Sequence, residues 1–214
     1  MSNIYTSRFF LQDDEITDTC LLKIPTNWHN RKYEYKWAMN FVSKNDICLD
    51  SACGIPHPFK FYLASVCDNV YAFDISKNIK NYDDILSSVY NFFDEEDFFK
   101  VTDYIYKINF SESNLNSLPY NDSFFSKIFC IGVINYLSDI DLICCLNEFY
   151  RVLKKGGYLI ITTDVPPTQV PKLTRLIDDI GFNFVGNIDI TKPKNIYSSP
   201  FPSCNNCFRV LVSK

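Results

Sequence analysis

The sequence lacks an excess of positive charge. Lys and Arg total 21 against 25 Asp and Glu, which gives a formal net charge of −4, and the lysines are dispersed along the chain. Such a balance provides no basic field for a phosphate backbone or for an anionic membrane surface. We therefore expect neither a nucleic acid nor a membrane as a partner.

Long apolar runs are also missing. The longest uncharged apolar run, Ile128–Ile134, is far shorter than the roughly 20 residues of a membrane-spanning helix. The N-terminal stretch is too acidic, and its apolar run too short, for a secretory signal. At 214 residues and 47% apolar content, the chain can bury one good core. We expect a soluble, cytoplasmic protein.

Histidine is scarce, which limits the metal sites that the nine cysteines could form. His29 and His57 are the only two histidines, and both are distant in sequence from the single C-x-x-C pair, Cys204 and Cys207. A zinc site needs two further ligands at matching spacing. Several other cysteines lie inside apolar runs, where a free thiol behaves as a small hydrophobe. An odd cysteine count without a secretory signal favours a reducing compartment, so we expect no disulfides and no metal site.

Hydrophobic periodicity predicts strands that alternate with helices. Helices are expected over Arg31–Ser43, Pro58–Val66, most of 77–104, Leu137–Leu153 and Val170–Ile180. Strands are expected over Asp46–Asp50, Asn69–Phe73, Tyr104–Phe110, Lys127–Ile134, Tyr158–Thr163, Phe182–Ile190 and Phe208–Ser213. The glycines after Leu153 are expected to stop the helix that precedes them. This order favours an α/β fold with a mostly parallel sheet.

The first 45 residues do not alternate like a strand. We expect residues 1–45 to form an N-terminal helical cap or lid, and residues 46–214 to form the main domain. Trp28, Arg31, Tyr33 and Tyr35 would give such a lid aromatic walls and one cation. The alternative is an amphipathic helix that packs on the edge of the sheet.

The segment Ile47–Ser76 carries the strongest functional signal. It is predicted to form a buried strand, a tight turn, a helix and a second buried strand that ends in Asp74, about 20 residues after the turn. In a nucleotide-binding sheet an acidic residue at that distance binds ribose hydroxyls. The glycine positions of the turn are occupied by Ala52, Gly54 and Pro56, so the turn has lost glycines that a pyrophosphate requires. The segment therefore indicates an adenosyl ligand other than a dinucleotide.

Five segments, in order and with matching spacing, resemble the class I S-adenosylmethionine-dependent methyltransferases, in particular their small-molecule, methyltransferase type 11-like branch. They are LDSACG (Leu49–Gly54), AFDIS (Ala72–Ser76), SLPYNDSFF (Ser117–Phe125), GVINYLSD (Gly132–Asp139) and RVLKKGGYLIITT (Arg151–Thr163). The resemblance implies a Rossmann-like, doubly wound sheet of seven mostly parallel strands with an antiparallel last strand. It implies S-adenosyl-L-methionine as cofactor.

The resemblance also implies roles for individual residues. Asp50 would face the methionine amino group, Asp74 the ribose hydroxyls and Ile75 the adenine face. The remaining cofactor-binding candidates are Ala52, Cys53 and Gly54 along the turn, Asn114 for the adenine amino group, and Arg31 for the cofactor carboxylate.

The chain departs from the family pattern at three places. Ala52 and Pro56 replace glycines, and Ser126 stands where the family has Asp. Ala52 is a mild change if its φ angle stays negative, whereas Pro56 fixes φ and removes an amide donor.

Three residues are catalytic candidates. His57 follows the turn and can transfer protons near neutral pH, while Asn135 and Tyr136 follow a strand where this family borders the methyl group and its acceptor. Asp164, after a later strand, is equally compatible with a turn former and with an amine-binding residue. A general base is needed only if the acceptor arrives protonated.

Three functions remain open at this point. The favoured one is methyl transfer to a small-molecule or peptide acceptor through nitrogen or oxygen. A non-catalytic adenosyl-ligand-binding protein, or a partner subunit of the same fold, would fit the altered turn. A dehydrogenase of related topology would require nicotinamide binding, and the missing phosphate-loop glycines argue against it.

Overall fold

The computed structural model describes residues 4–199 and 206–214. Its strands are β1 (Ser7–Phe9), β2 (Thr19–Cys20), β3 (Leu22–Lys23), β4 (Ile47–Ser51), β5 (Asn69–Asp74), β6 (Ile108–Glu112), β7 (Phe125–Ile131), β8 (Leu153–Asp164), β9 (Asn183–Phe184), β10 (Ile188–Asp189) and β11 (Cys207–Ser213). Its α-helices are α1 (His29–Ala38), α2 (Phe59–Val66), α3 (Tyr82–Phe92), α4 (Glu95–Thr102), α5 (Asp139–Val152) and α6 (Val170–Ile180). The short 3₁₀ turns are η1 (Met39–Phe41), η2 (Lys77–Lys80), η3 (Ile105–Lys107) and η4 (Ile134–Tyr136).

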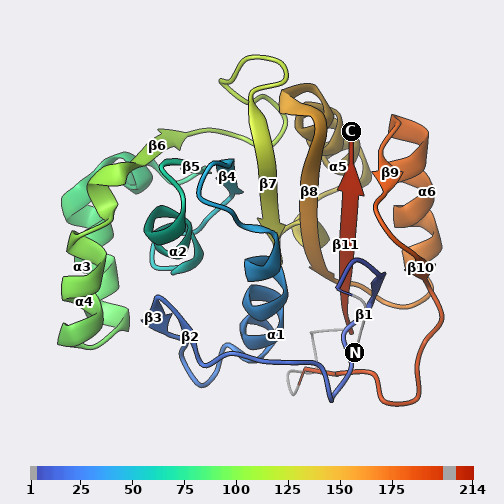
Figure 1. The fold of residues 1–214 in the computed structure, drawn as a ribbon, viewed down its shortest axis with the longest axis horizontal. Coiled ribbons are helices and arrows are strands. Elements are labelled where there is room, and N and C mark those ends of the chain that lie inside the picture. The colour runs from blue at the N-terminus through green and yellow to red at the C-terminus, as the bar shows by residue number, and fades with distance from the viewer. Residues whose placement is uncertain (1–3, 200–205) are drawn as a thin grey trace.

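One large sheet organises the chain, in the order β10-β1-β11-β8-β7-β4-β5-β6, with β9 pairing to β11 (Figure 1). The strands β8, β7, β4, β5 and β6 are parallel to their neighbours in this run, and β11 is antiparallel to β8. The expected doubly wound, mostly parallel sheet with an antiparallel last strand is confirmed.

Within the described part of the chain, the sheet holds nine strands rather than the seven expected. The expected strand Phe182–Ile190 is two short strands, β9 and β10, which pair with different partners. Gly186 lies between them, and a Cβ there would stand 2.6 Å from the carbonyl oxygen of Tyr5. The chain therefore bends closely past the N-terminal segment at a residue without a side chain.

The expectation of no strand in residues 1–45 is wrong. β1 joins the large sheet beside β11 and β10, and β2 and β3 form a separate two-stranded hairpin. A three-residue strand is too short to show alternation, and its partner β11 lies about 200 residues further along the chain. Local pattern could not reveal this pairing.

Capping side chains explain other differences in element boundaries. The single helix expected over 77–104 is interrupted because the side chains of Asn81 and Asp94 each accept a backbone N–H and begin α3 and α4. Ser138 likewise caps α5, which therefore starts at Asp139. The third parallel strand starts at Ile108 rather than Tyr104, because η3 precedes it.

The ends of β7 and α5 also differ from the prediction. β7 covers Phe125–Ile131 instead of Lys127–Ile134, and Gly132 then turns the chain with a φ of +63°. α5 ends at Val152, and the following Lys-Lys-Gly-Gly stretch belongs to β8. The glycines thus do not cap the helix. α1 begins at His29 and ends at Ala38, so the predicted helix was placed a few residues too late.

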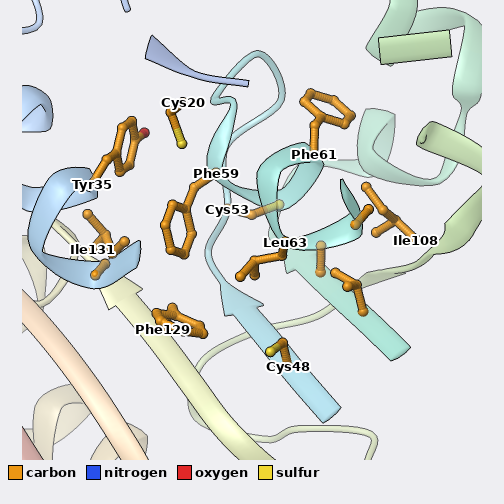
Figure 2. Packing of buried hydrophobic residues seen from close by; sticks show 14 of the residues in the cluster. Cys20, Tyr35, Cys48, Cys53, Phe59, Phe61, Leu63, Ile108, Phe129 and Ile131 are labelled. Atoms are coloured by element: carbon orange, nitrogen blue, oxygen red, sulfur yellow. The ribbon is translucent and has the colours of Figure 1, made fainter. Parts of the chain in front are cut away.

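Helices cover both faces of the sheet. Buried side chains of α1, α2, α3 and α4 pack with one face, and those of α5 and α6 pack with the other. Figure 2 shows the first layer, in which Tyr35 of α1 stacks on Phe59 of α2 with ring centroids 5.4 Å apart. Phe59 in turn meets Phe129 of β7 edge-on at 5.0 Å. Within residues 4–199 and 206–214, no helix is long and apolar enough to cross a membrane.

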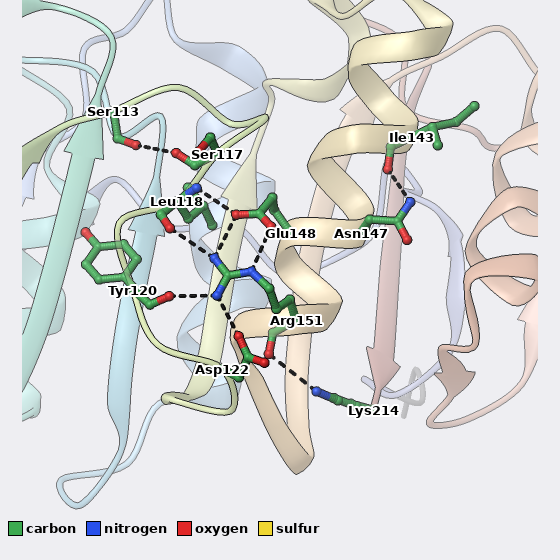
Figure 3. A network of polar contacts seen from close by, with 10 residues as sticks. All are labelled: Ser113, Ser117, Leu118, Tyr120, Asp122, Ile143, Asn147, Glu148, Arg151 and Lys214. Carbon is green, nitrogen blue, oxygen red and sulfur yellow. Dashed lines mark hydrogen bonds and ion pairs between the residues drawn. The ribbon is translucent and has the colours of Figure 1, made fainter.

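A polar network fixes the loop that precedes β7 (Figure 3). The guanidinium of Arg151 donates to the carbonyl oxygens of Leu118 and Tyr120 at 3.0 and 2.8 Å, and to both carboxylate oxygens of Glu148 at 2.8 Å. Asp122 accepts a further bond from Arg151 at 2.8 Å. The planar guanidinium therefore holds the 118–122 loop against α5 through several donors at once.

We predict that Arg151→Lys lowers the free energy of unfolding by about 1–3 kcal/mol, because an ammonium cannot reproduce the bidentate fork or reach all the loop carbonyls. Urea unfolding of the purified variant measures this change. The matched control is Arg175→Lys, whose ion pair with Asp179 is long at 3.8 Å and exposed. The control should change stability by less than about 0.5 kcal/mol. Equal effects of the two substitutions would contradict a structural role for the network.

Candidate functional site

The candidate site lies at the carboxyl ends of β4, β5 and β7. The chain runs from β4 outward to β5 and β6, and then returns to the other side of β4 as β7. In open parallel sheets the loops diverge at such a reversal and leave a crevice that binds ligands. Two cavities, of about 290 and 300 Å³, open there, and Ala52 and Val133 border both.

The turn after β4 has an unusual backbone. Ala52 has a φ of +48° and Gly54 a φ of +60°. The condition for a mild effect of Ala52, a negative φ, is therefore not met, and a left-handed alanine is strained by about 1–2 kcal/mol. At Gly54 a Cβ would lie 2.5 Å from the Cδ2 atom of His57. Glycine is needed at this second position for both its φ and its lack of a side chain.

Lys60, a residue that the sequence reasoning missed, holds this turn in place. Its side chain is fully buried, and its Nζ donates to the carbonyl oxygens of Gly54 and His57, both at 2.6 Å. Burial lowers the pKa of the Lys60 ammonium. A lysine in the otherwise apolar segment FKFYLASV was the signal available in the sequence.

Asp74 closes the turn from the neighbouring strand. Its Oδ2 accepts the N–H of Gly54 and its Oδ1 accepts the N–H of Ser76, both at 2.9 Å. Each carboxylate oxygen can accept a second hydrogen bond. Asp74 is thus oriented by the backbone and still able to bind a ligand hydroxyl.

The second cavity surrounds Asp74 and is bordered by Ile75, Asn114 and Asn116. Ile75 is 73% exposed, so its side chain forms an open apolar wall. The Oδ1 atom of Asn114 already accepts the N–H of Asn116 at 3.0 Å. Asn116 itself donates to Asp141 at 2.6 Å, and its Oδ1 is buried without a partner among the described residues. The sequence reasoning chose Asn114 and missed Asn116.

The first cavity is bordered by the carboxyl group of Asp50 and the guanidinium of Arg31. Asp50 is only 4% exposed, and burial raises the pKa of its carboxyl to about 7, with Asp74 adding to the rise while Lys60 and Arg31 oppose it. Arg31 lies against Gly132, where a Cβ would stand 2.1 Å from its Nη1. The cavity can therefore receive a ligand that carries both charges.

Arg31 is held by an acid from its own helix. Glu34 is fully buried and forms an ion pair with Arg31. The other oxygen of Glu34 accepts the hydroxyl of Thr162 at 2.6 Å and the thiol of Cys207 at 3.4 Å. Glu34 thereby anchors α1 to β8 and β11. Cys204, the other half of the C-x-x-C pair, lies outside the described residues.

His57 borders the first cavity in an enclosed position. Its ring stacks on Trp28 with centroids 4.2 Å apart, and its Nδ1 lies 3.1 Å from the hydroxyl of Tyr35. Burial lowers the pKa of His57 to about 3, and the charges of Arg31 and Lys60 add to this. The imidazole is therefore neutral at physiological pH and a weak base.

Asn135 and Tyr136 lie in η4, just after β7, and both are exposed. Tyr136 borders the first cavity and also a third cavity, of about 680 Å³, which Asn135 borders as well. The structure thus gathers the predicted residues around adjoining spaces. The first cavity is lined by Arg31, Asp50, Ala52, Cys53, Gly54, His57 and Tyr136, the second by Ala52, Asp74, Ile75 and Asn114, and the third by Asn135 and Tyr136.

Comparison with known families identifies the class of the protein. Residues 49–161, which are more than half of the chain, match the family described as "Methyltransferase domain". The chain belongs to this methyltransferase family. The match begins in β4 and ends in β8, so it includes the strands that border the first two cavities. No curated protein matches the sequence.

Solved structures show the same fold at low sequence identity. The PH0226 protein from Pyrococcus horikoshii has a TM-score of 0.58 at 14% identity, covering 88% of this chain and 92% of that one. A SAM-dependent methyltransferase from Aquifex aeolicus has a TM-score of 0.55 at 19% identity, with coverages of 83% and 87%. The [4+2]-cyclase SpnF has a TM-score of 0.56 at 17% identity, with coverages of 84% and 64%.

The protein is a methyltransferase with a Rossmann-like fold, and S-adenosylmethionine is the cofactor of this class. The cofactor carries no pyrophosphate, which agrees with a turn that keeps only one of its glycines. Its ammonium, carboxylate, ribose hydroxyls and adenine amino group have counterparts in Asp50, Arg31, Asp74 and the unpartnered Oδ1 of Asn116. The residues present therefore fit this group.

We predict that Ala52→Gly in the methyltransferase raises the free energy of unfolding by about 0.5–1 kcal/mol, because glycine adopts a positive φ without strain. Urea unfolding monitored by circular dichroism measures the change. The matched variant Gly54→Ala should lower stability by about 1 kcal/mol or more, since it adds the same strain and a contact with the stacked His57 ring. A stability loss in Ala52→Gly would contradict the left-handed conformation of Ala52.

Proposed function

We propose that this methyltransferase transfers the methyl group of S-adenosylmethionine to a small-molecule or peptide acceptor through a nitrogen or oxygen nucleophile. The observation that carries the proposal is the pair of cavities at the carboxyl edge of β4, one with a carboxyl group and a guanidinium and one with an oriented carboxylate. The acceptor side is a single cavity of about 680 Å³, a size typical of small-molecule pockets.

The second cavity is the proposed adenosine site. Asp74 accepts the ribose hydroxyls with the lone pairs that its backbone bonds leave free. Ile75 packs on one face of the adenine. The adenine amino group donates to Asn114 or Asn116, and the unpartnered, buried Oδ1 of Asn116 favours Asn116, because a buried acceptor gains most from a new donor.

The first cavity is the proposed methionine site. Asp50 binds the amino group and Arg31 the carboxylate, and a guanidinium fork suits a carboxylate. The backbone of Ala52, Cys53 and Gly54 lines the same ligand. In this arrangement α1 contributes one binding residue, which supports the proposal that residues 1–45 serve as a lid over the cofactor.

The proposed catalytic residues contribute mainly by positioning. Methyl transfer is an in-line displacement at a carbon activated by the sulfonium, so holding the nucleophile near the methyl supplies much of the acceleration. Tyr136 and Asn135 are proposed to border the acceptor at the junction of the first and third cavities. His57, neutral and bonded to Tyr35, is proposed as a hydrogen-bonding residue rather than a strong base.

A non-catalytic adenosyl-ligand-binding protein is the second candidate. The strained Ala52 and the amide lost at Pro56 favour it, since both alter the turn that positions the cofactor. One of the proteins with a similar fold is a [4+2]-cyclase, and a shared fold alone does not determine which reaction a protein catalyses. A screen of radiolabelled methyl transfer over amine, alcohol and carboxylic acid acceptors separates the two, because binding without any turnover would support the second.

We also propose a reducing, cytoplasmic location. All eight described cysteines are free thiols. Seven of the eight are buried, as expected for cysteines that act as small hydrophobic residues.

The proposed ligand site predicts a pH-dependent affinity for S-adenosylhomocysteine. The buried Asp50 carboxyl has a pKa of about 7 and must lose a proton to pair with the ligand's ammonium, which stays protonated below about pH 8. Affinity should therefore rise as pH increases from 5 to 7, by up to about tenfold per unit, and then level off. Calorimetric titration at several pH values measures this.

Two variants test the source of the pH dependence. Asp50→Asn should bind more weakly at pH 7 and lose the slope between pH 5 and 7. The control Asp68→Asn removes an exposed carboxylate at the opposite end of α2 and should keep the wild-type profile. An unchanged slope in Asp50→Asn would remove Asp50 from the proposed methionine site.

The adenosine half is tested separately. We predict that Asp74→Asn weakens S-adenosylhomocysteine binding by about tenfold or more, since the ribose hydroxyls lose a charged acceptor. The same calorimetric titration, with NAD as a second ligand, measures the loss. Tight NAD binding with no binding of the adenosyl-sulfur ligand would contradict the proposed function.

A further inference from the structure

The third cavity has one polar end and apolar walls. It lies beyond the carboxyl end of β8, between α5 and α6, and adjoins the proposed methionine site at Tyr136. Its apolar walls come from Ile134, Leu137, Leu142, Val165, Leu173 and Leu176. Its charged residues are Asp164 at the end of β8 and, from α5 and α6, Asp139 and Lys172. Asp139 and Lys172 neutralise each other in an exposed ion pair at 2.6 Å.

Asp164 is the carboxylate of this cavity that forms no ion pair with any described residue. One of its oxygens accepts the side-chain N–H of Asn30 at 2.7 Å, and the other has no hydrogen-bond partner within the described residues. The nearby cation Arg31 is paired with Glu34 instead. Burial, together with the charge of Glu34, raises the pKa of Asp164 to about 6, while the charge of Arg31 opposes the rise. A partly buried carboxylate gains most from a ligand that brings a positive charge and donors.

A second oxygen atom beside Asp164 also lacks a partner. Asn30 bonds to Asp164 directly, and the Oδ1 of Asn30 is buried and unbonded among the described residues. A carboxylate oxygen and an amide oxygen that both lack donors suit an ammonium group, which carries several donors and no acceptor.

We propose that the acceptor of this methyltransferase carries a primary or secondary amine that binds Asp164 as a cation, with an apolar body about the size of an aromatic ring against the walls of the third cavity. For methyl transfer the amine first passes one N–H proton to the Asp164 carboxylate, which frees the nitrogen lone pair. The inference rests on the proposed methyl transfer, because it assigns this cavity to the acceptor. A carboxylate-bearing acceptor is disfavoured by repulsion from Asp164, and a neutral alcohol offers one donor and no charge.

The test is calorimetric titration of the full chain with 2-phenylethylamine and with its neutral analogue 2-phenylethanol. Both are titrated with and without saturating S-adenosylhomocysteine. The amine should bind at least about tenfold more tightly than the alcohol, the gain expected for a charge-assisted hydrogen bond. This comparison uses the wild-type protein and needs no variant to fold.

Two variants locate the effect. Asp164→Asn, which keeps the size of the side chain and an oxygen for Asn30, should abolish the preference for the amine. Asp139→Asn removes a carboxylate from the same cavity, but an exposed one that is already paired with Lys172, and should leave amine affinity within about threefold. Thermal unfolding of both variants verifies that they are folded.

Equal affinity of the wild-type protein for amine and alcohol, or no binding of the amine, would overturn the inference. An amine preference that survives in Asp164→Asn would also overturn it. Failure of S-adenosylhomocysteine to bind in the same experiment would instead contradict the proposed function, so the two failures are distinguishable.

Discussion

The reversal of strand order beside β4 is the constraint on which the rest of the structure depends. β5 and β6 extend the sheet on one side of β4, and β7 returns on the other, so the loops at the carboxyl ends of β4 and β7 separate. This separation creates the space that a ligand can enter. The parallel pairing of β4 with both neighbours also places Asp50 and Asp74 at the same edge of the sheet.

Charged groups in this region are buried, which would be unfavourable if they served stability alone. Lys60 is compensated by two carbonyl oxygens and Glu34 by Arg31, Thr162 and Cys207. Asp50 has no side-chain hydrogen bond among the described residues, and its pKa is raised to about 7. Hydrogen-bonded charges thus fix the turn and α1, while the carboxyl group of Asp50, which lacks such a bond among the described residues, borders the cavity. Such an arrangement is typical of a binding site.

α1 connects the proposed cofactor and acceptor sites. Arg31 borders the first cavity, and the neighbouring Asn30 bonds to Asp164 at the third. Glu34, one turn further along the helix, ties both to β8 and β11. The two sites are therefore linked through one helix, which borders the first cavity and bonds to a residue of the third.

Much of the fold and part of the site could be predicted from the sequence. The apolar runs of β4, β5 and β7 and the glycine turn are local patterns. The sheet and the placement of Asp50, Gly54 and Asp74 could therefore be predicted from the sequence. β1 was missed because its pairing with β11 is long-range and its three residues show no period.

Details that depend on the direction of a side chain could not be predicted from the sequence pattern. Asn114 and Asn116 are equally plausible in sequence, and only the turn geometry reveals that the first is bonded locally and the second has a free oxygen. The positive φ of Ala52 and the bonds of Lys60 follow from how the turn packs on α2. His57 was expected near the site and lies there, but its burial against Trp28, which lowers its pKa, could be seen only in three dimensions.

The most direct measurement is a crystal structure of the protein with S-adenosylhomocysteine. The result expected is a ligand that crosses the edge of β4, with its ribose on Asp74, its adenine between Ile75 and Asn116, and its amino and carboxylate groups on Asp50 and Arg31. A ligand bound elsewhere, or one that leaves Asp50 and Asp74 without contacts, would contradict the assignment of this edge as the cofactor site.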